Sequence, residues 1–233
     1  MSVTLQTSPS RRPLLYLSLA ACVLLSVANA IGWVFDIPLL LSLFESLPKM
    51  VPATTVLVLA SAVSLWLQAR HPAQSGVAGG LGMLVCACGL LMLACNIFGM
   101  APRPFLLSQV GMQSALSLSA PLTAGIFGML GAALGLLARD REVELAQIGA
   151  VAVLLLALLN FAGYFFQETR LYEILPGKGS ALPTTGAALL LACATLMLRP
   201  DQGIMMVIGG SSPSARIARR LLYLALAVPV VLA

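Results

Sequence analysis

Apolar residues form long unbroken blocks in this chain, and most blocks are long enough to cross a membrane. A spanning helix needs roughly 20 predominantly apolar residues. Helices are expected, because backbone N–H and C=O groups find no water to bond with in hydrocarbon. We predict spans at residues 14–35, 52–68, 77–99, 121–137, 146–166, 183–198 and 216–233. The sequence therefore predicts an all-α polytopic membrane protein in which residues 1–233 form a single integral membrane domain of about seven transmembrane helices.

The composition agrees with a lipid bilayer as the main partner. Hydrophobic residues make up 60% of the chain, charged residues 9%, and the mean hydropathy is +1.00. Soluble domains carry about 25% charged residues. The net charge of +5 does not call for nucleic acid, because the positive residues gather on one predicted side of the membrane. The final block, 221–233, is too short to cross, so we expect the chain to stop inside its seventh span.

One polar pattern occurs three times. Asn-x-x-Gly closes an apolar block, Pro followed by Thr opens the next, and an Arg follows. The Asn-to-Pro separations are 23, 25 and 23 residues, and the Pro-to-Arg separations are 18, 18 and 16. Self-similarity of this kind indicates a repeated structural unit. We predict tandem helix-pair repeats that share one orientation, with short interfacial helices between the members of each pair.

The distribution of Lys and Arg predicts the orientation. If all seven blocks cross, nine of the 13 basic residues lie on the side of the N-terminus and four on the other. Cytoplasmic loops are enriched in Lys and Arg, so we expect a cytoplasmic N-terminus. The stretches 36–51, 103–119 and 167–181 are then interfacial segments on the outer side.

Six polar residues of the repeats are the candidate site, and all are expected near the outer face. They are Asn29, Asn96, Asn160, Thr54, Thr123 and Thr184. One interpretation is structural: an Asn in a spanning helix bonds to a neighbouring helix, and a Thr near a helix start satisfies orphan N–H groups. The alternative is that these side chains line an outward-facing pocket for a small ligand.

Small residues indicate close helix packing. Gly131 and Gly135 form a GxxxG pair, which suits a tight crossing inside one bundle or, as the alternative, a contact in a homo-oligomer. The five cysteines all lie in apolar blocks without Cys-x-x-Cys spacing, and His71 is the only histidine. We therefore expect no metal and no cofactor. No nucleophile with a nearby base and no paired carboxylates occur within the spans, so we do not expect an enzyme.

The C-terminal third of the chain resembles a known bacterial membrane module. Residues 182–188 read LPTTGAA, 198–203 read LRPDQG, and 215–222 read ARIARRLL. Over 171–233 the sequence is similar to the multi-pass membrane-associated sensor region at the N-terminus of bacterial sensor histidine kinases and diguanylate cyclases. The resemblance implies a location in the bacterial cytoplasmic membrane and a role in signalling. In that family the chain continues into PAS, kinase or cyclase domains, and we expect this chain to lack them.

Two functions remain open at this point. The first is a sensory or regulatory input module that acts on a signalling output protein. The second is a non-catalytic accessory subunit of a larger membrane complex. A transporter is disfavoured, because the predicted repeats are parallel and no spanning segment carries a central charge.

Overall fold

The computed structural model describes residues 12–42, 48–100, 118–139, 142–165 and 179–209, together with Arg216 and Arg220. All regular secondary structure in these ranges is helical. In chain order the elements are α1 (Arg12–Val34), α2 (Pro38–Ser42), α3 (Pro52–Arg70), the 3-10 turn η1 (Pro72–Gln74), α4 (Ser75–Ile97), α5 (Pro121–Ala138), α6 (Val143–Phe165), α8 (Leu182–Leu198) and α9 (Gly203–Gly209).

Five helices, α1, α3, α4, α5 and α6, are long and apolar enough to cross a membrane. Helix α8 is also apolar and has 17 residues. The prediction of an all-helical membrane protein is therefore confirmed. The predicted seventh span at 216–233 lies outside the described residues, apart from Arg216 and Arg220. Most of the second and third predicted interfacial stretches also lies outside them.

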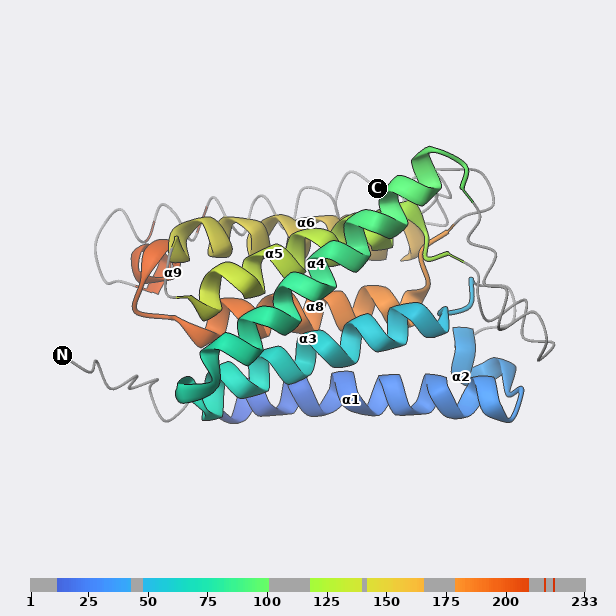
Figure 1. Cartoon of the computed structure of the whole chain (residues 1–233), viewed down its shortest axis with the longest axis horizontal. Coiled ribbons are helices and arrows are strands. Elements are labelled where there is room, and N and C mark those ends of the chain that lie inside the picture. The colour runs from blue at the N-terminus through green and yellow to red at the C-terminus, as the bar shows by residue number, and fades with distance from the viewer. Residues whose placement is uncertain are drawn as a thin grey trace.

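The six long helices lie side by side along one axis and form an inner and an outer set (Figure 1). The inner helices α3, α5 and α8 all contact one another. Each outer helix packs against two of them: α1 against α8 and α3, α4 against α3 and α5, and α6 against α5 and α8. Burial follows this division, since 72% of the span in α5 is buried but only 28% of the spans in α1 and α4. The bundle is a three-helix core encircled by three helices.

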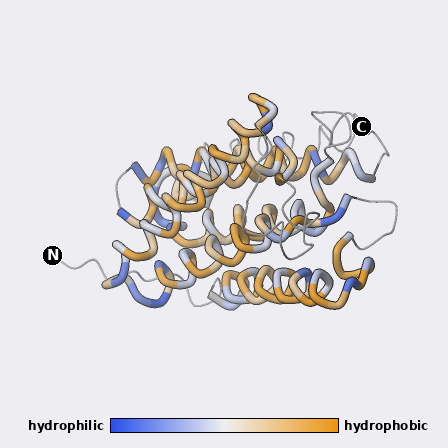
Figure 2. Tube along the Cα trace, turned by 45° about the vertical axis from the view of Figure 1, so that its right-hand side comes forward, coloured by the Kyte–Doolittle hydropathy of each residue, from blue (hydrophilic) through white to orange (hydrophobic). Residues whose placement is uncertain are grey.

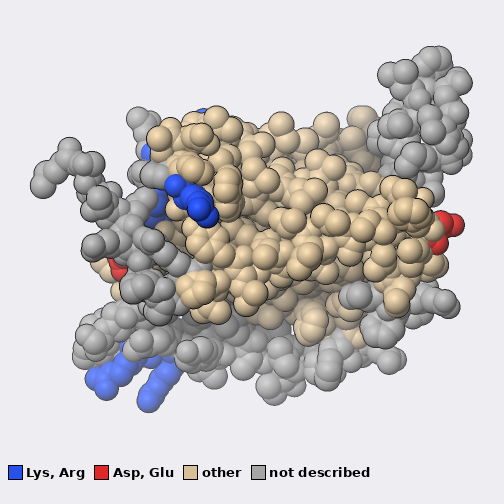
Figure 3. Space-filling model, turned by 90° about the horizontal axis from the view of Figure 1, so that it is seen from below, with Lys and Arg blue, Asp and Glu red and all other residues tan. Residues whose placement is uncertain are grey.

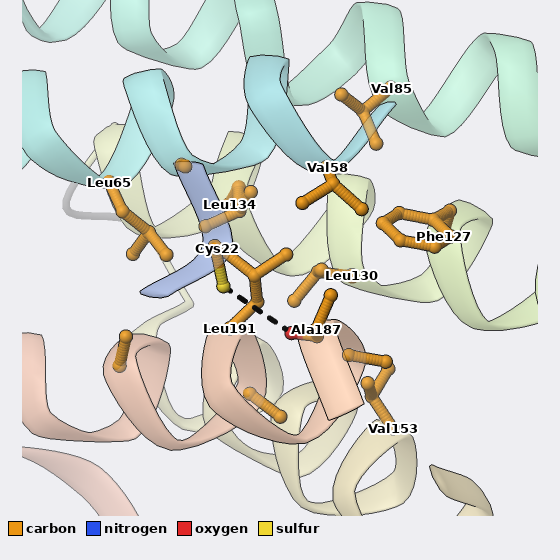
Figure 4. Packing of buried hydrophobic residues seen from close by; sticks show 14 of the residues in the cluster. Cys22, Val58, Leu65, Val85, Phe127, Leu130, Leu134, Val153, Ala187 and Leu191 are labelled. Atoms are coloured by element: carbon orange, nitrogen blue, oxygen red, sulfur yellow. Dashed lines mark hydrogen bonds between the residues drawn. The ribbon is translucent and has the colours of Figure 1, made fainter. Parts of the chain in front are cut away.

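The core lies where the inner helices meet. Phe127 and Leu130 of α5, Val58 and Leu65 of α3, and Leu191 of α8 are all buried in one cluster (Figure 4). Dense packing of this kind supplies van der Waals contacts, which drive helix association in a membrane because lipid tails are as apolar as leucine.

Proline marks the beginning of each inner helix. Pro52 and Pro121 are the first residues of α3 and α5, and Pro183 is the second residue of α8. Proline fits there because the first N–H groups of a helix have no partner within the helix, and its fixed φ suits the first turn. In each of these helices a threonine is the third residue.

Asn-x-x-Gly does not have one role in the three places where it occurs. Gly99, with φ of +64°, ends α4, and the Met100 N–H donates to the Cys95 carbonyl at 2.9 Å. That is the left-handed glycine termination common at helix ends. Gly32 instead lies inside α1, where an added Cβ would be 2.9 Å from Leu40 Cβ and from Leu41 Cδ2. It gives α2 room to pack against α1, so the second copy of the motif closes its helix and the first does not.

Helix α2 falls within the first predicted interfacial stretch, but it is packed against the bundle. Its Leu41 and Ser42 are buried, and the Leu41 carbonyl accepts a hydrogen bond from the Met50 N–H at 2.8 Å. Leu39 on its other side is 64% exposed. The segment therefore has one buried and one exposed face.

Polar and charged residues are concentrated at the two ends of the bundle. Hydrophobic residues dominate the lengths of the helices and hydrophilic residues their ends (Figure 2). On the face drawn in Figure 3 the middle of the molecule carries no charged side chain, and Lys and Arg gather at one end. Large apolar side chains such as Leu24 of α1 and Leu91 of α4 are exposed along the middle. This pattern is typical of a surface that faces lipid.

Glycines bring α4 and α5 into close contact. A Cβ added to Gly131 would collide with the backbone of Cys86, and one added to Gly82 would be 2.7 Å from the Gly135 nitrogen. Gly89 approaches Gly128 in the same way. Gly131 and Gly135 thus lie in a crossing between two helices of the same chain.

Candidate functional site

The six candidate residues lie at one end of the bundle and are all buried. The asparagines are in the last two turns of the outer helices α1, α4 and α6. The threonines are each the third residue of an inner helix, α3, α5 or α8. Their exposed fractions run from 0% to 4%, for Asn29, Asn96, Asn160, Thr54, Thr123 and Thr184. Outer helices run towards this end and inner helices start from it, which brings the two sets together.

The asparagine of the first helix pair is hydrogen-bonded at both ends of its amide. The Thr55 hydroxyl donates to Asn29 Oδ1 at 2.9 Å, and Asn29 Nδ2 donates to the Met50 carbonyl at 3.3 Å. The indole N–H of Trp33 donates to the same carbonyl at 2.9 Å. Three side chains therefore fasten the end of α1 to the start of α3.

The second pair repeats one of these bonds. Asn96 Nδ2 donates to the Ser119 carbonyl at 3.0 Å and to the Met92 carbonyl in its own helix at 2.9 Å. Ser119 and Met50 both lie two residues before the start of an inner helix. The asparagine thus satisfies a carbonyl at the same position in both pairs.

The third pair leaves part of its amide without a partner. Asn160 Nδ2 donates to the Thr185 hydroxyl at 2.7 Å, and that hydroxyl donates to the Ala181 carbonyl at 3.2 Å. Asn160 Oδ1 is buried and makes no hydrogen bond with any described residue. Rotating the amide by half a turn would match the Thr55–Asn29 bond but would leave Nδ2 unpartnered instead. One end of this buried amide has unused bonding capacity in either orientation.

The threonines connect one helix pair to the next. Thr54 and Ser119 share a hydrogen bond between their hydroxyls at 2.6 Å, and Thr123 and Ser180 share another at 2.6 Å. Thr184, at the equivalent place in α8, makes no hydrogen bond within the described part of the chain. The inner helices are therefore fastened at two of their three junctions.

Sequence reasoning missed five members of this network. They are Thr55, Thr185, Ser119, Ser180 and Trp33. The serines were detectable, because each lies two residues before an inner helix. Thr55 and Thr185 directly follow the threonines that the sequence analysis selected. One residue further along a helix is a rotation of about 100°, so these hydroxyls face the asparagine and their neighbours face the next pair.

The network has the chemistry of a polar joint. It consists of hydroxyls, amides, backbone carbonyls and the indole N–H of Trp33, and its described members include no ionisable side chain. Across the described ranges, no three His, Cys, Asp or Glu side chains are grouped closely enough to hold a metal ion. These groups donate and accept hydrogen bonds, which suits helix–helix fastening or recognition of a small polar molecule.

Comparison with known proteins adds no family to this description. No protein-family model matches the sequence, and no curated protein or solved structure matches it either. The class that the fold defines is a helical membrane protein with several apolar spans.

Proposed function

We propose that this chain is the transmembrane sensory or regulatory input module of a bacterial signalling protein and has no catalytic activity of its own. The observation that carries the proposal is the set of hydrogen bonds at one end of the bundle. The helix pairs are fastened there by single side-chain bonds, Thr54 to Ser119 and Thr123 to Ser180. Each such bond contributes only about 0.6–2 kcal/mol, so a ligand that offers a replacement hydrogen bond can offset its loss.

The proposed architecture has three tandem helix pairs in one orientation. The bonds from Asn29 to the Met50 carbonyl and from Asn96 to the Ser119 carbonyl support it, because they join equivalent positions. The alternation of outer and inner helices around the core supports it too. In this proposal a seventh span follows α9, and the pairs are related by rotation about the membrane normal.

The proposed location is the bacterial cytoplasmic membrane, with the N-terminus in the cytoplasm. The position of basic residues at the C-terminal ends of the inner helices supports this orientation. These residues are Arg70, Arg139 and Arg199. Loops rich in Lys and Arg stay on the cytoplasmic side. The asparagine–threonine end then faces outward.

The third helix pair is the best place for a signal molecule to act. Asn160 has a buried amide end without a hydrogen-bond partner among the described residues. A ligand shifts an equilibrium only by its difference in affinity for the two states. A small polar molecule meets this condition when it bonds the free end of the Asn160 amide in one arrangement of the helix pairs and not in the other.

The resemblance to membrane-associated sensor regions also supports the proposal. The LPTTGAA stretch opens α8 and supplies Thr184 and Thr185 to the polar network. The LRPDQG stretch forms the turn from α8 to α9, ending at Gly203 with φ of +56°. Both resembling stretches therefore occupy helix junctions. Junctions are where a signal that moves helices is received and passed on.

The decisive test is purification of the natural protein from its own membrane in a gentle detergent, with intact-mass measurement of every polypeptide present. We expect either a chain that continues beyond Ala233 into a kinase or cyclase domain or a signalling protein bound in fixed ratio. A chain of the mass of these 233 residues, accompanied by fixed amounts of non-signalling membrane subunits, contradicts the sensor proposal. A chain of that mass with no companion contradicts it as well.

One observation favours a second candidate, a non-catalytic accessory subunit of a membrane complex. Gly76 and Gly80 lie on the exposed face of α4, and nothing lies within 4 Å of a Cβ added to either. Small residues spaced by four on a lipid-facing helix let another helix approach closely. The same purification separates the two candidates, because an accessory subunit co-purifies with the membrane protein whose helix packs against α4. Gly80→Leu then weakens the association, whereas Leu91→Ala, further along the exposed face, leaves it intact.

A further inference from the structure

Gln147 joins three helices at the end of the bundle opposite the asparagine–threonine network. It lies in the second turn of α6 and is fully buried. Its Nε2 donates to the Arg199 carbonyl at 2.9 Å and to the Gln202 carbonyl at 3.1 Å, and its Oε1 accepts from the Met205 N–H at 3.1 Å. One side chain therefore bonds the whole turn from α8 to α9.

Two of the three groups bonded by Gln147 are ones that helix ends leave unsatisfied, and the third, the Gln202 carbonyl, also accepts the Met206 N–H at 3.3 Å. The Arg199 carbonyl belongs to the C-cap of α8, and the Met205 N–H lies in the first turn of α9. Terminal carbonyls and first-turn N–H groups have no partner inside their own helix. The Gln147 side chain of α6 therefore caps both the end of α8 and the start of α9. The two helix ends are consequently held by α6.

The turn is shaped to fit this side chain. Gly203 has φ of +56°, in the left-handed region that favours glycine. A Cβ added there would be 2.6 Å from Gln147 Oε1 and 3.3 Å from Glu144 Cα. Helix α9 also contacts α6 directly. The position of α9 is therefore set by the first turns of α6.

We propose that Gln147 is a positioning residue that couples α6 to α9, so that movement of α6 relative to α8 is passed directly to the segment after α8. The regulatory meaning of this coupling rests on the proposed function. In a sensor, the end of α6 at Asn160 lies in the polar network and its beginning holds α9. Helix α6 is then a rigid connection between the ligand-facing end and the output end of the bundle.

Hydrogen exchange of the full chain in detergent tests the coupling without reference to signalling. We expect the Met205 amide to exchange about tenfold faster or more in Gln147→Leu, because local opening of α9 no longer breaks a side-chain bond. Gly203→Ala keeps Gln147 but places a methyl group against its Oε1. We expect this variant also to accelerate exchange of the Met205 amide. Amides in the middle of α5 and α8 are expected to keep wild-type rates in both variants.

Gln68→Leu is the matched control. Gln68 is also a buried glutamine, and its Nε2 donates to the Ser64 hydroxyl at 3.2 Å and to the Leu134 carbonyl at 3.3 Å, away from α9. We expect the Met205 amide to exchange at the wild-type rate in this variant. Unchanged exchange in Gln147→Leu and Gly203→Ala overturns the coupling, and so does equal acceleration in Gln68→Leu. If Gln147→Leu does not fold, Gly203→Ala decides alone.

The test also separates failure of the coupling from failure of the sensor proposal. Hydrogen exchange of the Met205 amide measures the hydrogen bonds of Gln147 whether or not an output domain exists. The mass of the purified assembly reports the output domain whether or not the joint exists.

Discussion

At the scale of single residues, the polar network is stabilised by bonds that are individually weak and jointly specific. Side-chain hydrogen bonds between membrane helices contribute roughly 0.6–2 kcal/mol each. A buried group left without a partner costs about 1–3 kcal/mol. The cost of an unpartnered group decides the effect of mutation here, because each mutation leaves the hydrogen-bond partner of the replaced residue in apolar surroundings. Replacing Asn29 and replacing Asn160 would leave different numbers of neighbouring groups without a hydrogen bond.

Replacing Asn29 by leucine is expected to destabilise the bundle more than replacing Asn160. Asn29→Leu leaves the Thr55 hydroxyl without its acceptor and removes one donor from the Met50 carbonyl. We expect a loss of about 1–2 kcal/mol in the free energy of unfolding. Asn160→Leu removes one bond together with an amide end that is already unpartnered, so its loss is expected to be about half as large or less. Unfolding in mixed micelles measures both.

A double-mutant cycle with Thr55→Val assigns the cost to the Thr55–Asn29 bond. The double variant is expected to be less destabilised than the sum of the single variants, because it leaves no unpaired hydroxyl. Strict additivity would mean that the two side chains do not interact in the membrane. A larger loss for Asn160→Leu than for Asn29→Leu would contradict the expected order of the two asparagines.

At the scale of helices, the sequence predicts the boundaries of the six long helices to within three residues, and the beginnings marked by proline most closely. The predicted starts at 52, 121 and 183 fall within one residue of α3, α5 and α8, because proline fixes the first turn. The other starts differ by two or three residues, since an apolar block has no sharp edge. The ends depend on what each helix packs against. Gly99 ends α4, whereas the equivalent Gly32 continues α1 beneath α2.

The crossing of α4 and α5 gives a prediction that depends on the position of each glycine. Gly131→Ala places a methyl group against the backbone of Cys86, and backbone cannot move aside as a flexible side chain can. We expect a destabilisation of about 1–3 kcal/mol from overpacking. Gly125→Ala is the control in the same helix, because nothing lies within 4 Å of its added Cβ. It is expected to be neutral or stabilising by up to about 1 kcal/mol from helix propensity.

Thermal unfolding in detergent compares the two alanine variants with the wild type. Equal stability of Gly131→Ala and Gly125→Ala would show that α4 and α5 are not closely packed. A stable but less oligomeric Gly131→Ala protein would move the GxxxG contact from within the chain to between chains.

At the scale of the whole molecule, the sequence indicated a rotational arrangement of helix pairs but not which helices form the centre. Hydropathy does not distinguish them, since every long helix is apolar. The distinction lies in which side chains find partners across the bundle, and that depends on helix rotation. The same limit explains why the sequence selected Thr54 without indicating Ser119 as its partner. Sequence spacing shows which residues occupy equivalent positions in the repeats, whereas helix packing determines which of those residues contact one another.

Unequal fastening of the three junctions gives the last prediction. Thr54 and Thr123 are each bonded to a serine two residues before the next inner helix. The corresponding residue before α3 is Met50, which has no hydroxyl, and Thr184 is left without a partner in the described structure. Thr→Val keeps the shape and removes the hydroxyl. We therefore expect Thr54→Val and Thr123→Val to lower the free energy of unfolding by about 1 kcal/mol each, and Thr184→Val to leave it unchanged.

Ser180→Ala combined with Thr123→Val is the control for this series, because it removes both hydroxyls of one junction and is expected to cost less than the two single changes together. An equal loss at all three threonines would show that the third junction is fastened as firmly as the others. The expected inequality instead identifies the junction between α8 and the first helix pair as the one without a bond between two hydroxyls among the described residues; the bond there runs from the Cys22 thiol to the Ala187 carbonyl at 3.8 Å. The unpartnered end of the Asn160 amide lies at the same end of α8, so both sets of variants test the polar contacts at the start of that helix.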